Sequence, residues 1–522
     1  MVKMFRVGVA FFLALICVGS FVSVSTVSPA WAVAAWSQVG SDIDGEAASD
    51  QSGNSVSFNS DGSRVAIGAP YNDGAGTDAG HVRVYNLTGG AWVQVGSDIN
   101  GEAADDSSGR SVSLSSDGTT VAIGAIYNDD AGADAGHVRV YRLTGGAWVQ
   151  VGSDINGEAA SDRSGISVSL SSDGSRVAIG ANFNDGAGSD AGHVRVYSLT
   201  GGAWVQVGRD INGEAASDYS GNSVSLSSDG SRVAIGALGN DGGRPNAGHV
   251  RVYSLTGGAW VQVGSDIDGK AADDYSGDSV SLSSDGSRVA IGATGDDGGG
   301  TNAGHVRVYI LTGGAWVQVG SDINGEAAGD SSGYSVSLSS DGSRVAIGAV
   351  ANNGGTAFSG HVRVFGLTGG AWVQVGSDIN GEANRDYSGY SVSLSSNGCT
   401  VVIGAIGNAG GGSAAGHARA YEVSGCLGIT SEPRSLKVTK KTTVSRTLVW
   451  AVPLSLNGGL VTDYVIQYRV AKTTMWSTFT DGISTSTTAT VTGLTTKVKY
   501  QFQVAARTSG GDSPYSTATK AS

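Results

Sequence analysis

Alternating polar and apolar positions recur along most of the chain and predict short β-strands. Residues 55–58, Ser-Val-Ser-Phe, alternate with the two-residue period of a strand. Residues 64–69, Arg-Val-Ala-Ile-Gly-Ala, form an apolar run of small side chains, which is typical of a strand covered on both faces. Residues 81–85 and 92–96 predict a third and a fourth strand, and tight turns rich in Gly, Asp and Ser separate the strands. The pattern therefore predicts a unit of four antiparallel strands.

This unit occurs seven times with a period of 56 residues and without insertions. All the histidines of the chain mark the period, because each opens the third strand of a unit. They are His81, His137, His193, His249, His305, His361 and His417. A repeat of this length with four strands per unit predicts an all-β, seven-bladed β-propeller. An open β-solenoid is the alternative, but it would need distinct capping repeats.

The two ends of the repeat array indicate how the propeller would close. The position 56 residues after Trp372 is Gly428, where the period calls for tryptophan. A matching Trp-Ser-Gln-Val-Gly strand stands alone at residues 36–40, before the first unit. We therefore expect the N-terminal strand to complete the last blade, which would cover two exposed sheet edges.

The unit resembles a known repeat family. The string Gly-x-Ser-Val-Ser-x-x-x-Asp-Gly, followed by Val-Ala-Ile-Gly-Ala and Gly-His-Val-Arg-Val-Tyr, is similar to FG-GAP repeats over residues 36–421. The resemblance implies a propeller like those of integrin α-chains and of many secreted bacterial proteins. Calcium-binding members carry an aspartate-rich loop between the first two strands. Here that hairpin is only Ser-Ser-Asp-Gly-Ser, which is too short to wrap a cation.

The segments on either side of the propeller, which we assign to residues 33–428, differ from it in composition. Residues 1–32 combine a positively charged start, an apolar stretch and an Ala-Trp-Ala cleavage site, which predicts a signal peptide and secretion. An uncleaved membrane anchor is the alternative. Residues 429–522 resemble a fibronectin type III domain, which implies that Trp450 fills a sandwich core and that Tyr500 forms a tyrosine corner.

Net charge divides the chain in the same way. Residues 33–429 hold 19 Lys and Arg against 42 Asp and Glu, a net charge of −23, whereas residues 430–522 hold 11 against 4, a net charge of +7. An acidic body argues against nucleic acid as a partner. We expect an extracellular glycan or protein partner, no membrane attachment once the signal peptide is removed, and a monomer.

No residues stand out as catalytic, because every serine-rich stretch is repeated and no unique carboxylate pair is evident. The histidines are expected to be hydrogen-bonded framework residues, since symmetry spreads them around a ring and keeps them from converging on one metal ion. The inter-blade connection spaces Asp98, Asn100, Glu102 and Asp106 as in a calcium loop, but Lys270 breaks the pattern in the fifth copy. Asx turns and backbone capping explain these residues more simply, so we expect no metal and no cofactor, with calcium as the alternative.

Three series of positions vary between the units while the framework hardly changes. Two series precede the first strand and one follows the second strand, so all three are expected on one face. Tyrosine and arginine are common binding anchors. The predicted ligand-binding residues are therefore Tyr71, Arg110, Tyr127, Arg163, Tyr219, Tyr275, Tyr334, Tyr387 and Tyr390. Drift at unconstrained loop positions is the alternative explanation.

These features predict a secreted, non-enzymatic recognition, adhesion or scaffold protein that binds through one face of the propeller. The alternative is an extracellular enzyme that acts on polysaccharide at the propeller's central mouth. A disulfide between Cys399 and Cys426 is also expected. Both replace other residues in turns at the same end of the last blade, Cys17 leaves with the signal peptide, and export provides an oxidising compartment.

Overall fold

The computed structural model describes residues 35–424 and residues 433–519, the latter with gaps at 454–460, 462, 472, 474, 481, 483, 509–510, 514 and 517. The described residues contain no helix, so the protein is all-β as predicted. Accordingly, they include no helical segment long and apolar enough to cross a membrane. The predicted signal peptide, residues 1–32, lies outside the described residues.

The first repeat unit forms a five-stranded antiparallel sheet. Its strands are β3 (Ser55–Phe58), β4 (Arg64–Ala69), β5 (His81–Thr88), β6 (Ala91–Gln94) and β7 (Ile99–Asn100). The order is β3-β4-β5-β6, and the short β7 also pairs with β5. The predicted four strands are confirmed, and β7 is a fifth, short strand that the sequence pattern did not predict.

Five further sheets repeat this order. The second contains β8 (Ser108–Leu114), β9 (Thr120–Ala125), β10 (His137–Thr144), β11 (Ala147–Gln150) and β12 (Ile155–Asn156). The third contains β13 (Ser167–Leu170), β14 (Arg176–Ala181), β15 (His193–Thr200), β16 (Ala203–Gln206) and β17 (Ile211–Asn212). The fourth contains β18 (Ser220–Leu226), β19 (Arg232–Ala237), β20 (His249–Thr256), β21 (Ala259–Gln262) and β22 (Ile267–Asp268). The fifth contains β23 (Ser276–Leu282), β24 (Arg288–Ala293), β25 (His305–Thr312), β26 (Ala315–Gln318) and β27 (Ile323–Asn324). The sixth contains β28 (Ser332–Leu338), β29 (Arg344–Ala349), β30 (His361–Thr368), β31 (Ala371–Gln374) and β32 (Ile379–Asn380).

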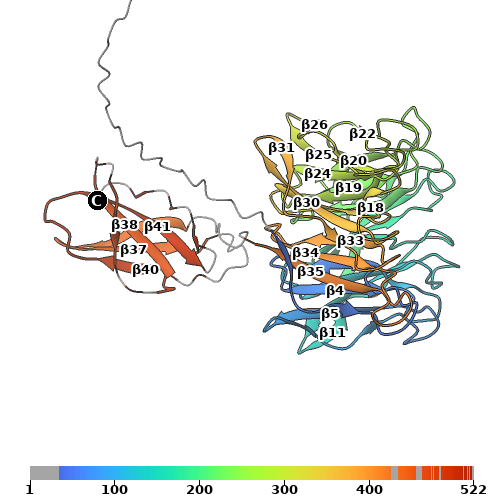
Figure 1. Cartoon of the computed structure of the whole chain (residues 1–522), viewed down its shortest axis with the longest axis horizontal. Helices are drawn as coiled ribbons and strands as arrows, with labels where there is room; N and C mark the ends of the chain where they lie inside the picture. Colours follow the sequence, from blue (N-terminus) through green and yellow to red (C-terminus); the bar gives the residue numbers. More distant parts are fainter. Residues whose placement is uncertain are drawn as a thin grey trace, which may run out of the picture. The chain divides into compact units, whose positions relative to one another are not determined.

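The seventh sheet combines the last repeat unit with the N-terminal segment. It contains β33 (Ser388–Leu394), β34 (Thr400–Ala405), β35 (His417–Val423), β1 (Trp36–Gln38) and β2 (Ile43–Asp44). The pairing of the N-terminal strand with the last unit is as predicted, because β1 lies antiparallel to β35 with Trp36 opposite Val423. The seventh sheet also packs against the first, through contacts of β33 and β34 with β3. Figure 1 shows these orange strands beside the blue strands of the first unit.

Small residues allow the sheets and turns of the repeat to form. Gly89 and Gly90 adopt positive φ angles of 60° and 83°, the backbone that a two-residue hairpin turn requires. In β4, a Cβ atom on Gly68 would lie 2.0 Å from the carbonyl oxygen of Gly109 in the next sheet. The small residues of the second strand are therefore needed because a neighbouring sheet lies directly against it.

Each apolar core lies between two consecutive sheets. Between the third and fourth sheets, Val194 and Val196 pack against Leu226 and Ile235, and all four side chains are buried. Tryptophans tie the outer strands together in the same way. Trp260 donates a hydrogen bond from Nε1 to the carbonyl oxygen of Val207 in the preceding sheet, at 2.8 Å. The repeated, mutually packed sheets are consistent with a β-propeller.

The C-terminal residues form two sheets around a separate core. One sheet holds β36 (Arg434–Lys441), β37 (Arg446–Ala451) and β40 (Thr488–Val491). The other holds β39 (Ser477–Phe479), β38 (Asp463–Val470), β41 (Tyr500–Thr508) and β42 (Gly511–Asp512). Trp450 is buried between them, and the hydroxyl oxygen of Tyr500 accepts a hydrogen bond from the backbone N–H of Thr495 at 3.1 Å. Both placements are as the resemblance to a fibronectin type III domain implied.

Candidate functional site

The first strands of all seven sheets line a cavity of about 260 Å³ at one of their ends. We call it the variable cavity, because one equivalent position from each unit lines it with a different set of side chains. These residues are Asn54, Arg110, Ile166, Asn222, Asp278, Tyr334 and Tyr390. The two positions that follow each of them along the strand are serine and valine in every unit. The cavity therefore combines a repeated backbone with unlike side chains.

Arg110 organises one side of the variable cavity. Its Nη1 donates hydrogen bonds to Oδ1 of Asn54 at 3.0 Å and to the hydroxyl oxygen of Tyr390 at 3.2 Å. The rings of Tyr334 and Tyr390 pack with their centroids 5.0 Å apart. Burial alone would raise the pKa of the Tyr390 hydroxyl, but the charge and hydrogen bond of Arg110 outweigh burial and lower it. Two tyrosines, an amide and a guanidinium thus form one connected polar wall.

Asp278 provides a carboxyl group on the other side. Arg110 belongs to the second unit and Asp278 to the fifth, and both line the variable cavity. Thr294 donates a hydrogen bond from Oγ1 to Oδ2 of Asp278 at 3.0 Å, and Asn222 donates from Nδ2 to Oδ1 at 3.4 Å. Burial raises the pKa of the Asp278 carboxyl from 3.8 to about 6. The cavity is therefore lined by a guanidinium group and by a carboxyl group whose pKa is raised.

The other nominated residues lie outside the variable cavity and form what we call the rim group. These are Tyr71, Tyr127, Arg163, Tyr219, Tyr275 and Tyr387. Three rim tyrosines, Tyr219, Tyr275 and Tyr387, precede the first strand of their units and pack against a glycine that follows the second strand. A Cβ atom on Gly239, for example, would lie 2.7 Å from the ring of Tyr219. Where the residue after the second strand is aromatic, as Phe183 is in the third unit, the residue before the first strand is not aromatic. Arg163 lies 4.3 Å from the ring centroid of Phe183.

Size complementarity gives three of the rim tyrosines a structural reason to vary. Tyrosine before the first strand accompanies glycine after the second strand, as in Tyr275 with Gly295 and Tyr387 with Gly407. The structure thus divides the nine nominated residues. It brings Arg110, Tyr334 and Tyr390 into the variable cavity and leaves six outside it. Asp278 occupies the position equivalent to Arg110, Tyr334 and Tyr390 but was not predicted. The sequence-based prediction considered only tyrosine and arginine as binding anchors.

The repeated histidines are buried, and their contacts differ between the units. Nδ1 of His305 lies 2.9 Å from Oδ1 of Asp296, whereas Nε2 of all seven histidines has no hydrogen-bond partner among the described residues. Nδ1 of His81 lies 3.9 Å from Oε2 of Glu46, while Nη1 of Arg83 lies 3.3 Å from Oε1 of the same carboxylate. Burial and the charge of Arg83 lower the pKa of His81 to about 4.

The oxygen side chains that resemble a calcium loop in sequence point to different partners. Asp98 accepts a hydrogen bond from Nε2 of Gln94 at 2.6 Å, and Oδ2 of Asp106 accepts one from the backbone N–H of Ala103 at 3.0 Å. Glu102 instead pairs with Arg139 of the next sheet, at 3.2 Å. The side chains of this segment therefore do not converge on one point. Asp106 caps the backbone, in agreement with the expected backbone capping.

The structure describes only one of the two cysteines of the predicted disulfide. Cys399 is buried in the turn before β34, with 3% of its surface exposed. Cys426 lies outside the described residues, so its pairing with Cys399 stays a prediction.

Comparisons with known proteins agree with the C-terminal assignment. Residues 431–522 match the family model of the fibronectin type III domain, so the chain carries this domain at its C-terminal end. A search of curated proteins gave no match.

Several solved structures are similar to part of the chain. A protein assigned as a 6-phosphogluconolactonase from Bacteroides uniformis is 13% identical, with a TM-score of 0.45, and the match covers 63% of this chain and 85% of that one. A periplasmic gluconolactonase from Pseudomonas aeruginosa is 17% identical, with a TM-score of 0.42, and the match covers 62% and 84%. Module A71 of titin from human cardiac muscle is 28% identical over 18% of this chain and 90% of that one, with a TM-score of 0.17.

Proposed function

We propose that residues 33–428 form a closed, seven-bladed propeller of the FG-GAP type and that the protein is secreted as a non-enzymatic recognition, adhesion or scaffold protein. Seven repeat units with seven sheets, and the pairing of β1 with β35, support the closed architecture. The signal-peptide pattern at residues 1–32 supports secretion. The fibronectin type III domain fits an adhesion or scaffold role, because such domains commonly serve as spacers or binding modules.

The ligand of this proposal is an extracellular glycan, bound by its terminal sugar in the variable cavity. The observation that carries the proposal is the contrast within the cavity lining, where seven equivalent positions hold five residue types and the serine and valine that follow them are the same in every unit. Arginine, asparagine and aspartate can hydrogen-bond to sugar hydroxyl groups, and the paired rings of Tyr334 and Tyr390 offer an apolar face. A volume of about 260 Å³ suits one small polar unit rather than a long chain.

A glycan array with the secreted protein tests this function, and two arginines provide a matched pair. Arg110→Ala removes the cation of the variable cavity, whereas Arg163→Ala removes one from the rim group. We expect Arg110→Ala to weaken binding of the best array ligand about 10-fold or more, and Arg163→Ala to leave it within about 2-fold. Unchanged affinity of a folded Arg110→Ala protein would contradict binding at the cavity.

The alternative, an enzyme acting on polysaccharide, gains support from one observation at the same place. A carboxyl group with a pKa of about 6 can act as a general acid near neutral pH, and Asp278 has such a pKa. Under this alternative, Asp278→Asn would abolish turnover of a polysaccharide panel and retain substrate binding. Under the binding proposal, neither the natural protein nor the variant releases product.

A further inference from the structure

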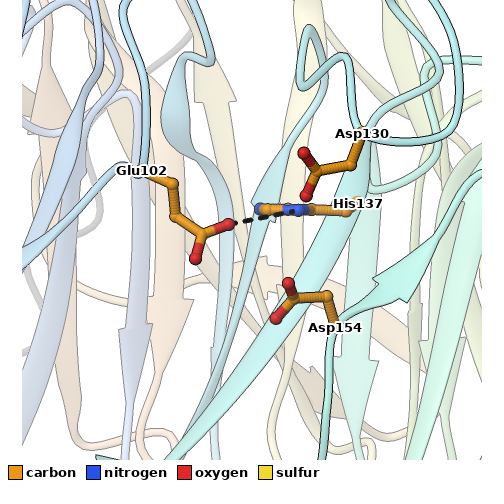
Figure 2. A group of neighbouring side chains, drawn as sticks. All are labelled: Glu102, Asp130, His137 and Asp154. Carbon is orange, nitrogen blue, oxygen red and sulfur yellow. Dashed lines mark ion pairs between the residues drawn. The ribbon is translucent and has the colours of Figure 1, made fainter.

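A four-residue cluster at the boundary between the first and second sheets has the composition of a metal site. Glu102 follows β7 of the first sheet, His137 opens β10 of the second, Asp130 lies in the loop before β10, and Asp154 precedes β12. One possible ligand atom from each residue lies within 4.8 Å of those of the other three. Figure 2 shows the four side chains converging on one space from these separate segments.

His137 is the buried and unpartnered member of the cluster. Its side chain has no exposed surface, and neither ring nitrogen has a hydrogen-bond partner among the described residues. Nδ1 faces Oε2 of Glu102 at 3.8 Å, which is too long for a hydrogen bond. Two ligands that each bind one ion at about 2.0–2.1 Å can lie up to about 4.2 Å apart, so the separation accommodates an ion between them.

Neighbouring residues hold one oxygen of two of the carboxylates, and the other oxygen of Glu102 faces His137. Nη1 of Arg139 holds Oε1 of Glu102 at 3.2 Å, and Nε2 of Gln150 donates to Oδ1 of Asp154 at 2.5 Å. Such supporting contacts orient metal ligands in proteins. The three carboxylates contribute −3 and Arg139 contributes +1, so the cluster carries −2 with a neutral imidazole, which matches the charge of a divalent ion.

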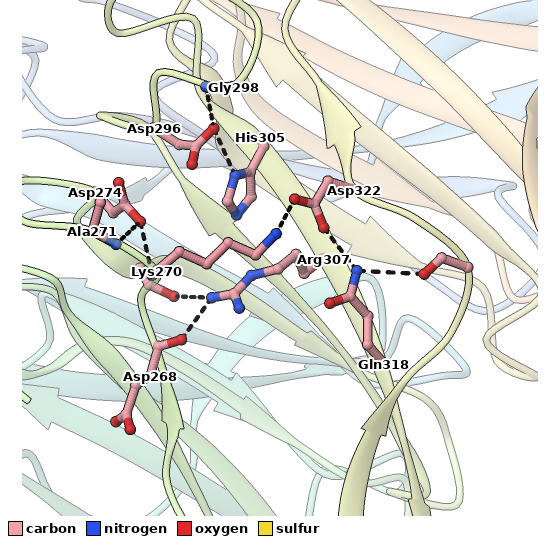
Figure 3. A network of polar contacts seen from close by, with 12 residues as sticks. Asp268, Lys270, Ala271, Asp274, Asp296, Gly298, His305, Arg307, Gln318 and Asp322 are labelled. Carbon is pink, nitrogen blue, oxygen red and sulfur yellow. Dashed lines mark hydrogen bonds and ion pairs between the residues drawn. The ribbon is translucent and has the colours of Figure 1, made fainter.

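The fifth unit carries a built-in cation at the corresponding place. Lys270 replaces the glutamate, and its ammonium contacts Oδ2 of Asp322, while Gln318 donates to Oδ1 of the same carboxylate at 2.8 Å. Asp296, which is asparagine in the other six units, lies 2.9 Å from Nδ1 of His305. Figure 3 shows this arrangement. Two carboxylates, Lys270 and Arg307 sum to zero, so this unit has neutralised the charge that the second unit retains.

We propose that Glu102, Asp130, His137 and Asp154 bind a divalent transition-metal ion, such as Zn²⁺ or Mn²⁺, and thereby join the first sheet to the second. A ligand set of one imidazole and three carboxylates favours such ions over Ca²⁺, which prefers oxygen ligands alone. Because Asp130 is glycine in the other six units, the second unit has the tightest site. Three-residue versions, such as Glu46, His81 and Asp98, are weaker sites of the same kind.

Calorimetric titration of the chelator-treated secreted protein with ZnCl₂, MnCl₂ and CaCl₂ tests the site. We expect one tight site for Zn²⁺ or Mn²⁺ and weak binding of Ca²⁺. Asp130→Asn should lower the affinity of the tight site about 10-fold or more, and the matched Asp129→Asn, which removes the adjacent exposed charge, should leave it within about 2-fold. A rise in the unfolding temperature on adding the ion, lost in Asp130→Asn, gives a second readout.

The fifth unit supplies a gain-of-binding test. Lys270→Glu combined with Asp296→Asn restores the residues of the other units, and we expect one additional weak site. Lys270→Gln with Asp296→Asn removes the lysine charge without adding a carboxylate, and we expect no additional site. The proposal is overturned if neither Zn²⁺ nor Mn²⁺ binds at about 1 mM, or if Asp129→Asn and Asp130→Asn weaken binding equally, because binding would then follow surface charge alone.

Discussion

The two ends of the first strands use the same repeated backbone in opposite ways. At the end that we call the serine end, each unit places the same serine, and its backbone N–H donates to the carbonyl oxygen of the serine in the following unit. The donors are Ser60, Ser116, Ser172, Ser228, Ser284, Ser340 and Ser396, and the bond from Ser396 returns to Ser60 at 2.8 Å. At the variable cavity, the equivalent positions share no single residue type. Main-chain bonding thus holds the ring together and leaves the cavity side chains free to differ.

The serine end also explains the polar residues of the first strand. The backbone N–H of Leu282 donates to Oγ of Ser225 in the preceding unit at 2.9 Å, and Leu338 repeats this contact with Ser281. The edge of each first strand is therefore satisfied by a serine side chain from its neighbour rather than by another strand. Replacing such a serine removes a contact between two units. Replacing a residue of the variable cavity changes only the contacts of the polar side chains there.

The largest expected effect comes from breaking the main-chain ring. Ser284→Pro removes the N–H that donates to the carbonyl oxygen of Ser340 at 2.8 Å and leaves that oxygen without its partner. We expect the free energy of unfolding to fall by about 3 kcal/mol or more, measured by urea denaturation of the secreted protein. A loss below about 1 kcal/mol would show that the ring is not needed for stability.

Removing the buried charge of Asp278 from the variable cavity should raise the free energy of unfolding, whereas Ser284→Pro should lower it. Burial raises the pKa of Asp278 from 3.8 to about 6, so the protonated carboxyl stabilises the folded state at acid pH. This contribution is fully present below the unfolded pKa and is lost as the pH rises through the folded pKa. Asp278→Asn keeps a neutral side chain at every pH. We expect the variant to be more stable than the natural protein by about 2 kcal/mol near pH 7.5.

The pH dependence of this difference provides the control. Near pH 4 the carboxyl is protonated in the folded protein, so the gap between Asp278→Asn and the natural protein should shrink to about 0.5 kcal/mol or less. Urea denaturation at both pH values measures the gap. A variant that is equally or less stable near pH 7.5 would mean that Thr294 and Asn222 hold the ionised carboxylate well enough to offset its burial.

Measurements of ligand affinity should show whether the variable cavity or the rim group binds the ligand. Tyr334→Ala removes one ring of the pair with Tyr390, whereas Tyr219→Ala removes a ring that packs over Gly239. We expect Tyr334→Ala to weaken binding of the best array glycan by about 1–2 kcal/mol and Tyr219→Ala to change it by less than about 0.5 kcal/mol. Calorimetric titration measures both. The reverse ranking would move the binding site to the rim group.

Much of the fold follows from the period, because each unit repeats the alternation, glycine turns and tryptophan that specify its first four strands. The strand Ile99–Asn100 was missed because two residues cannot display a period. The site was harder to predict, since its contacts join different units. Glu102 and Asp98 are close in sequence, yet Glu102 faces His137 of the second sheet while Asp98 faces His81 of the first. A repeat read one unit at a time does not show such contacts.

The smallest expected effect returns to the serine end and separates its side chains from its main chain. Ser284→Ala removes the hydroxyl that lies 2.9 Å from Oγ of Ser340 but keeps the N–H that donates to the Ser340 carbonyl oxygen. These hydroxyl groups line a second cavity, where water can replace the lost partner. We therefore expect the free energy of unfolding to change by less than about 0.5 kcal/mol, measured under the same conditions as Ser284→Pro. A loss above about 1.5 kcal/mol would show that the hydroxyl groups, and not the main chain alone, hold the seven units together at the serine end.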